Sequence, residues 1–157
     1  MKRIDFERIE EENYLYDTCE LLYNKYFNFE DKQELKSFER EIWMVGSEII
    51  EYIRKTKKKI FTDTLLQELL KIINQCKYER GRESFVMLLH YFKENPNIET
   101  YISSLLDDEQ LCAFAIGELT KLKLFSYTDK VQAILSKEKI AWKKKEAKRY
   151  IERSNNR

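Results

Sequence analysis

Glycine and proline are scarce in this chain of 157 residues, which contains three glycines and one proline. Both residues interrupt helices and shape tight turns, and β-sheet folds use many of them. Leucine, isoleucine, lysine and glutamate are abundant by contrast. The composition therefore predicts an all-helical fold with long helices and short connections.

Histidine is as rare as proline, because His90 is the only one. A single histidine excludes metal sites that need two histidine ligands and most histidine proton relays. The sequence also lacks a glycine-rich phosphate loop, an HExxH motif, a CxxC motif and a nucleophile elbow. We expect no catalytic residue, no metal ligand and no cofactor, so the chain is predicted not to be an enzyme. A Cys–His dyad, with a cysteine beside His90 in space, is an alternative that the sequence leaves open.

Long apolar runs are also missing, since none approaches the roughly 18 residues of a membrane helix. The N-terminal segment MKRIDFERIEEEN is too charged for a secretory signal. We therefore expect a cytoplasmic protein without membrane contact. The three cysteines, Cys19, Cys76 and Cys112, are odd in number and lie in apolar stretches, which indicates buried, reduced thiols.

Charged residues make up 36% of the chain, and their signs are unevenly distributed. Residues 1–22 contain seven acids and three bases, whereas residues 137–157 contain nine bases and three acids. In the second segment, the spacing of Lys144 with Lys148 and of Lys145 with Arg149 predicts one exposed strip on a helix. These four residues are candidates for contact with an anion or a nucleic acid. The alternative, which we favour, is a solvated face that keeps a terminal repeat soluble.

Aromatic residues are plentiful, with ten tyrosines and nine phenylalanines. Those near the N-terminus are more numerous than one amphipathic face can bury. Exposed aromatic side chains often dominate the binding energy of protein interfaces. Tyr14, Tyr16 and Tyr23 are therefore predicted to contact another protein or a second copy of the chain.

Apolar residues at intervals of three and four predict the helices of the first half. One helix is expected over residues 4–26. A second begins at an N-cap of Asp31 with Glu34 and ends near Lys59, and a third is capped by Asp63. The apolar stripes of the second and third helices are expected to be Leu35, Phe38, Ile42, Val45, Ile49 and Tyr52, and Leu65, Leu66, Leu69, Ile72 and Ile73.

The second half predicts a series of helix pairs. Gly81 is expected to turn the chain into a helix over residues 82–93, whose apolar segment SFVMLLHYF should make it the most buried one. Pro96 marks a firm boundary after that helix. Two pairs should follow, over 98–106 with 109–123 and over 128–137 with 141–153, with caps at Asp107 or Asp108 and at Asp129, and with a frayed end at 154–157.

A small residue recurs in these helices with a regular spacing. Ser84, Ala115 and Ala147 are 31 and 32 residues apart, and a large apolar residue follows each by four positions, at Leu88, Leu119 and Ile151. Such a period is typical of a helical solenoid. Small side chains are needed where stacked helices approach to about 8–10 Å. An ordinary helical bundle, which uses alanine for the same reason, is the alternative.

The segment YISSLLDDEQLCAFAIGEL resembles a HEAT repeat. It has an apolar first helix that ends in the leucine pair 105–106, an aspartate-bearing turn at 107–108, and a second helix with small residues at Ala113, Ala115 and Gly117 before Leu119. The sequence departs from the family pattern at 111–112, where Leu-Cys replaces the usual valine and arginine. In the last unit Lys143 and Lys144 occupy that position. The resemblance extends over about residues 64–153.

The resemblance implies a right-handed HEAT-like α-solenoid of about three helix pairs. Residues 1–60 would form an N-terminal helical hairpin, either a cap or a diverged repeat, and residues 61–157 the HEAT-like repeats, all in one continuous domain. It also implies a concave surface for an extended partner, and so a non-enzymatic protein-binding module such as an adaptor or a toxin-neutralising immunity protein.

Two other functions are alternatives to protein binding. The first is a nucleic-acid-binding HEAT-like protein that uses the C-terminal basic surface. The second is a HEAT-like DNA glycosylase, in which a buried aspartate and aromatic residues work on a basic concave surface. The chain offers Trp142 and several tyrosines, but no glycosylase motif matches residue by residue.

Overall fold

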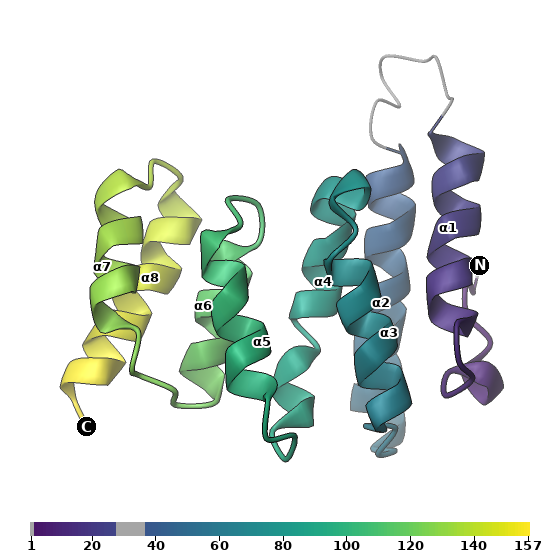
Figure 1. Cartoon of the computed structure of the whole chain (residues 1–157), viewed down its shortest axis with the longest axis horizontal. Coiled ribbons are helices and arrows are strands. Elements are labelled where there is room, and N and C mark those ends of the chain that lie inside the picture. The colour runs from purple at the N-terminus through teal and green to yellow at the C-terminus, as the bar shows by residue number, and fades with distance from the viewer. Residues whose placement is uncertain (1, 28–36) are drawn as a thin grey trace. The chain divides into compact units, whose positions relative to one another are not determined.

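The computed structural model describes residues 2–27 and 37–157. These residues form eight α-helices, four short 3-10 helices and no strand, which confirms the all-helical prediction. The chain divides into two compact units, Met1–Leu88 and Leu89–Arg157 (Figure 1). Residue 60, the expected end of an N-terminal hairpin, lies inside the first unit, and the division into hairpin and repeats stays a prediction.

The first unit is built around α2. It contains the helices α1 (Tyr14–Tyr26), α2 (Ser37–Thr56), α3 (Asp63–Ile73) and α4 (Glu83–Val86), together with the 3-10 helices η1 (Phe6–Arg8) and η2 (Cys76–Arg82). Helix α2 packs against α1, η2 and α4, and α3 packs against α1 and α4. The apolar stripe of α3 is buried as predicted, and so are Ile42, Val45 and Ile49 of α2. Phe38 and Tyr52 are half-buried, and Leu35 lies outside the described residues.

The expected first helix is wrong at its start, because α1 begins at Tyr14 and not at Ile4. A separate 3-10 turn comes first, and Asn13 then adopts a left-handed conformation with φ 65°. The reason is the burial of both Ile4 and Ile9. On one continuous helix these residues would lie about 140° apart and could not both face the core.

Helix ends also differ from the sequence-based expectation. Thr62, not Asp63, caps α3: its backbone is extended, and its hydroxyl oxygen accepts a hydrogen bond from the Leu65 amide at 3.2 Å. Asp63 is the first helical residue instead, and a carboxylate there suits the helix dipole. Helix α2 ends at Thr56, before Lys57 with φ 56°. The expected cap of Asp31 with Glu34 lies outside the described residues.

Gly81 does not make the predicted turn. Its φ is not positive, and Glu79 has the unusual backbone conformation, with φ 47° and ψ −125°. Gly81 lies against α2 instead, where an added β-carbon would be 3.1 Å from the Glu39 carbonyl oxygen and from the Ile42 β-carbon. The glycine therefore allows a close approach of η2 to α2.

The single helix expected over 82–93 is interrupted. Helix α4 ends at Val86, and a 3-10 helix η3 (Leu89–Phe92) follows. The predicted burial is confirmed, because Phe85, Val86, Leu88 and Leu89 are all buried. The interruption coincides with the boundary between the two compact units.

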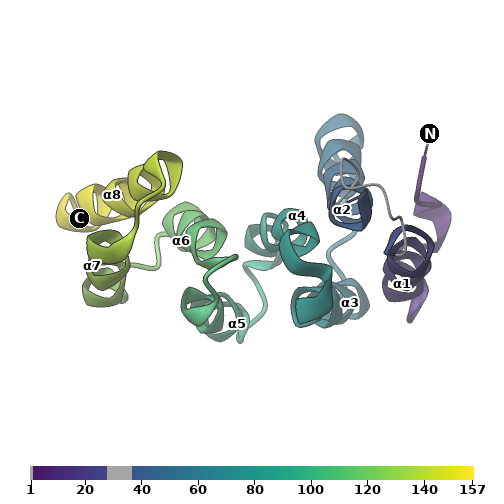
Figure 2. The same cartoon turned by 90° about the horizontal axis from the view of Figure 1, so that it is seen from above.

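The second unit consists of two helix pairs, shown from above in Figure 2. They are α5 (Ile98–Ser104) with α6 (Cys112–Lys121), and α7 (Thr128–Lys137) with α8 (Ala141–Asn155). A 3-10 helix, η4 (Leu105–Asp107), follows α5. Helix α6 packs against α5 and α8, and α8 also packs against α7. Ala115 and Ala147 are fully buried, as predicted for a close helix crossing.

The turns of this unit test the remaining cap predictions. The carboxylate of Asp108 accepts hydrogen bonds from the amides of Gln110 at 2.9 Å and Leu111 at 3.2 Å in the turn before α6. The N-cap residue of α6 is Leu111, so the prediction of a cap at Asp107 or Asp108 was wrong. Asp129 was a wrong prediction, because it lies exposed in the first turn of α7 and Tyr127 is the N-terminal flanking residue.

The C-terminal end of α8 is more ordered than expected. Tyr150, not Ile151, is the fully buried residue, and its hydroxyl donates to the Leu124 carbonyl at 2.7 Å. Ile151 is only half-buried. Ser154 was expected to fray, but it is buried, and its hydroxyl lies 2.8 Å from that of Thr128. The side-chain bond ties the last turn of α8 to the start of α7.

A buried glutamate fixes one helix to a main-chain amide in each unit. Glu68 of α3 accepts hydrogen bonds from the Tyr16 amide at 3.2 Å and from Lys71 at 3.3 Å. Glu118 of α6 accepts them from the His90 amide at 2.7 Å and from Lys121 at 2.8 Å. Both glutamates stand in the same short pattern, Glu-Leu-x-Lys, at 68–71 and 118–121. The lysine one turn later neutralises the buried carboxylate.

Candidate functional site

The four basic residues selected from the sequence lie together on the outer face of α8. Lys144, Lys145, Lys148 and Arg149 line one hollow of about 460 Å³ with Ala141 and Glu152. This face is opposite the buried side of the helix, which carries Ala147, Tyr150 and Ser154. We call these four residues the α8 strip.

Three cations of the α8 strip have no counter-ion in the part of the chain that the structure describes. Among residues 2–27 and 37–157, the ammonium groups of Lys144, Lys145 and Lys148 make no ion pair or side-chain hydrogen bond. Several other lysines of the chain differ: Lys55 is 2.7 Å from Glu51, Lys77 2.7 Å from Glu20, Lys121 2.8 Å from Glu118 and Lys130 2.7 Å from Asp107. Arg149 pairs with Glu146 at 3.2 Å. The hollow therefore keeps uncompensated positive charge.

Exposed apolar residues flank the strip at the start of α8. Trp142 is 42% exposed and Ile140 46% exposed. The Trp142 ring packs against the ring of Phe114 of α6, with 5.3 Å between ring centroids. Positions 142, 145 and 149 follow at intervals of three and four, so the indole borders the strip. The sequence contained a signal for this surface, namely two large apolar residues at the solvated end of a basic helix.

The tyrosines predicted to contact a partner lie in the first unit, and all three are half-buried. The Tyr14 hydroxyl accepts a hydrogen bond from the Asp5 amide at 2.7 Å. The Tyr16 hydroxyl accepts one from the Gln75 side chain at 2.9 Å. Tyr23 packs its ring against Phe27, Phe38 and Tyr78, with centroids 4.9, 5.1 and 5.7 Å away. These contacts give each tyrosine an internal role, and their role in binding a partner stays a prediction.

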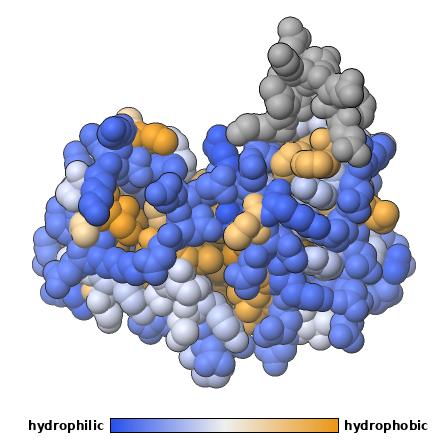
Figure 3. All heavy atoms as spheres, turned by 45° about the horizontal axis from the view of Figure 1, so that its top comes forward, coloured by the Kyte–Doolittle hydropathy of each residue, from blue (hydrophilic) through white to orange (hydrophobic). Residues whose placement is uncertain are grey.

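Two other residues, one in α1 and one directly after it, are more exposed than these tyrosines. Leu21 is 72% exposed and Phe27 is 55% exposed. Figure 3 shows hydrophilic residues over most of the visible face and hydrophobic residues in smaller patches. Leu21 was not among the residues selected from the sequence.

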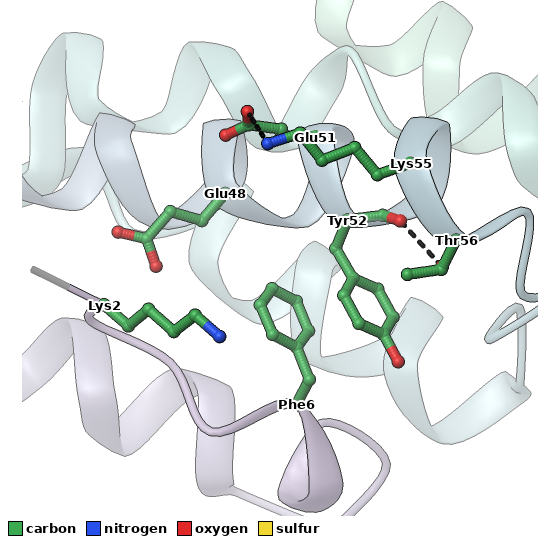
Figure 4. A pocket seen from close by; sticks show the side chains of 7 residues that line it. All are labelled: Lys2, Phe6, Glu48, Glu51, Tyr52, Lys55 and Thr56. Carbon is green, nitrogen blue, oxygen red and sulfur yellow. Dashed lines mark hydrogen bonds and ion pairs between the residues drawn. The ribbon is translucent and has the colours of Figure 1, made fainter.

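A separate pocket of about 240 Å³ lies in the first unit, between η1 and α2 (Figure 4). Its aromatic wall is formed by Phe6 and Tyr52, whose rings stack in parallel with 3.9 Å between centroids and 4° between planes. The remaining lining residues are Lys2, Glu48, Glu51, Lys55 and Thr56. Sequence analysis did not find this pocket, because its two walls are more than 40 residues apart in the chain.

The single histidine and two of the three cysteines are engaged in contacts or buried. The Nδ1 atom of His90 is 2.7 Å from the Glu118 carboxylate, as a structural histidine requires. Burial raises the pKa of the Cys19 thiol, and burial also raises that of Cys112, which keeps both thiols protonated and unreactive. Cys76 was expected to be buried but is exposed. No group of three or more His, Cys, Asp or Glu side chains in the described part of the chain could hold a metal ion.

Comparison with protein-family models, with curated proteins and with solved structures finds no match for this chain. No helix within the described ranges is long and apolar enough to span a membrane. The surfaces described above are therefore the basis for assigning a function.

Proposed function

We propose that this chain is a non-enzymatic protein-binding module and that its partner presents an acidic surface to the α8 strip. The observation that supports this most is the convergence of three unpaired lysines on one hollow, next to the exposed Trp142. Tryptophan and arginine are the residues that most often dominate binding energy at protein interfaces. Complementary charge around them accelerates association and selects the partner.

The architecture that we propose for the module is a right-handed HEAT-like α-solenoid, with about three helix pairs after an N-terminal hairpin. The burial of Ala115 in α6 and of Ala147 in α8, two helices that pack against each other, supports it. In such a stack the second helices of successive pairs form the binding surface. Both α6 and α8 are second helices, and Phe114 and Trp142 meet between them.

An adaptor or a toxin-neutralising immunity protein is the role that agrees best with these features. A neutralising protein acts by covering a surface of its target, which requires tight binding and no chemistry. We also propose a cytoplasmic location, since the described structure has three free cysteines and a reducing compartment keeps thiols free. A partner with a cluster of carboxylates would restore charge balance at the α8 strip.

Nucleic-acid binding is the second candidate function. It is favoured by the same four cations, because phosphate contacts come mostly from lysine and arginine. Trp142 and Ile140 favour it less, because they add exposed apolar surface that contact with a phosphate backbone does not need. The lone acid in the hollow, Glu152, does not decide between the two.

A photo-crosslinking experiment tests the protein-binding proposal directly. A benzoyl-phenylalanine placed at position 145 should link to one predominant protein in cells, and the purified partner should then be titrated with the chain. We expect the variant with Lys144, Lys145, Lys148 and Arg149 all changed to Gln to bind at least tenfold more weakly, which corresponds to about 1.4 kcal/mol. A matched variant with Arg54, Lys57, Lys58 and Lys59 changed to Gln should bind normally.

The two candidate functions are separated by a fluorescence-anisotropy titration with generic DNA at low salt and at about 150 mM salt, where screening is strong. We expect no DNA binding that survives the higher salt. Submicromolar DNA binding at that salt, lost in the four-glutamine variant of the α8 strip, would overturn the ranking. The salt slope should then fall by roughly one for each phosphate contact removed.

A further inference from the structure

The pocket beside η1 combines the stacked rings of Phe6 and Tyr52 with two carboxylates that contact cations. The Glu48 carboxylate accepts a hydrogen bond from the Arg3 amide at 3.0 Å and another from the Arg3 guanidinium at 3.0 Å. Glu51 pairs with Lys55 at 2.7 Å. Both carboxylates that line the pocket thus contact a cation, and Glu48 shares Arg3 with Glu41, which lies 2.6 Å from the same guanidinium.

Lys2 is the other charged residue that lines the pocket, besides Glu48, Glu51 and Lys55. Its ammonium group has no ion pair or hydrogen bond with any residue in the described ranges. Figure 4 shows the Lys2 side chain extending toward the Phe6 ring. A ligand that enters therefore meets one ammonium group without an ion pair in the described ranges, beside two aromatic rings.

The size of the pocket limits the ligand. A volume of about 240 Å³ is below the roughly 300–1,000 Å³ of sites for drug-sized molecules. It suits one ring and a small polar group. Aromatic rings pack favourably on other rings in offset or edge-to-face arrangements, and a carboxylate is the natural counter-ion of an ammonium group.

We propose that this pocket binds an aromatic carboxylate, with its ring against Phe6 and Tyr52 and its carboxylate at Lys2. Two sources share this chemistry, namely the C-terminal aromatic residue of a polypeptide and a free aromatic acid. The site belongs to the first unit and does not depend on the α8 strip, so it adds a second binding site to the proposed function.

An NMR titration of the ¹⁵N-labelled chain tests the proposal with three probes: N-acetyl-phenylalanine, its amide, and the peptide acetyl-Gly-Gly-Gly-Phe with a free C-terminus. For the two acids we expect saturable shifts centred on residues 2–6 and 48–56, with dissociation constants of the order of 1 mM. The amide should bind about two- to fivefold more weakly, as expected for the loss of one solvent-accessible ion pair. Tighter binding of the peptide than of N-acetyl-phenylalanine identifies a polypeptide terminus as the source, and equal binding identifies a free acid.

Variants separate the charge from the aromatic wall. Lys2→Gln should lower the affinity of the acids to that of the amide, whereas Lys59→Gln, an exposed lysine outside the pocket, should change nothing. Thr56→Phe should fill the mouth of the pocket and abolish binding of all three probes without disturbing buried residues. The proposal is overturned if no saturable shifts occur at Phe6 and Tyr52, if acid and amide bind equally, or if the shifts are confined to the α8 strip.

Discussion

Gly46 of α2 lies so close to Ser84 of α4 that a β-carbon at position 46 would be 2.8 Å from the β-carbon of Ser84 and 2.2 Å from its hydroxyl oxygen. Glycine inside a helix costs about 1 kcal/mol relative to alanine. Its presence in the middle of α2, a helix of 20 residues, is explained by this contact. Ser84 was recognised from the sequence as a small inner-face residue, but its partner was not.

Gly46→Ala should therefore destabilise the first unit even though alanine favours a helix. Overpacking at a close contact typically costs about 1–3 kcal/mol, and a urea titration will measure the loss. Gly117→Ala provides a matched control in α6, because its β-carbon would be 3.5 Å from the Glu146 carboxylate, an ordinary contact. That variant should be neutral or up to about 1 kcal/mol more stable. A gain of stability in both variants would contradict the close packing of Gly46 on Ser84.

Ser84→Ala should leave stability unchanged or raise it. The Ser84 hydroxyl oxygen is buried without a hydrogen-bond partner in the described structure, and an unsatisfied buried polar group costs about 1–3 kcal/mol. The melting temperature of the alanine variant will check this. A clear decrease would mean that the hydroxyl has a partner, such as a buried water.

Ala115→Leu should destabilise the second unit by about 1–3 kcal/mol, because Ala115 is fully buried in α6. The comparison is Leu21→Ala in α1, where the side chain is 72% exposed and a change within about 0.5 kcal/mol is expected. Thermal unfolding of both variants, followed by circular dichroism, makes the test. An unchanged transition for Ala115→Leu would refute its place at a close crossing.

Removal of the Glu118 carboxylate should lower the stability of the second unit. Glu118→Ala leaves the amide of His90 without its acceptor, at a cost of about 1–3 kcal/mol. Glu118→Gln keeps an oxygen acceptor and should recover part of that loss. Hydrogen exchange at the His90 amide should be faster in the alanine variant and intermediate in the glutamine variant. Equal exchange rates in all three proteins would exclude the bond as a source of protection.

The Arg3–Glu41 pair should make stability depend on pH in the acid range. The hydrogen bond from Arg3, at 2.6 Å, holds the pKa of Glu41 below its ordinary value of 4.5. A carboxylate with a lowered pKa in the folded state contributes stability that is complete above its unfolded pKa and is lost as the pH falls through the folded value. The difference in unfolding free energy between the wild type and Glu41→Gln should thus be constant at neutral pH and shrink below pH 4.5. A difference that is constant down to pH 2 would contradict the pairing.

The sequence predicts well what depends on local spacing. The stripe from Leu65 to Ile73 and the α8 strip both follow from intervals of three and four residues, which fix a helix face without knowledge of the rest of the fold. It predicts poorly what depends on a distant partner. The break before Tyr14 reflects burial of Ile4 and Ile9, and the contact of Gly46 with Ser84 joins residues 38 positions apart. The pocket at Phe6 and Tyr52 and the lack of counter-ions for Lys144 are likewise properties of the folded chain alone.

Each glutamate of the two Glu-Leu-x-Lys segments accepts a hydrogen bond from a main-chain amide. This affects which substitutions the donor positions can accept. Every residue except proline carries the same amide, so the contact makes almost no demand on the side chain of the donor. The donors are already different, Tyr16 for Glu68 and His90 for Glu118. The amide contacts therefore leave the side chains at positions 16 and 90 to other tasks: the Tyr16 hydroxyl accepts a hydrogen bond from Gln75, and the His90 ring adds a second contact to Glu118.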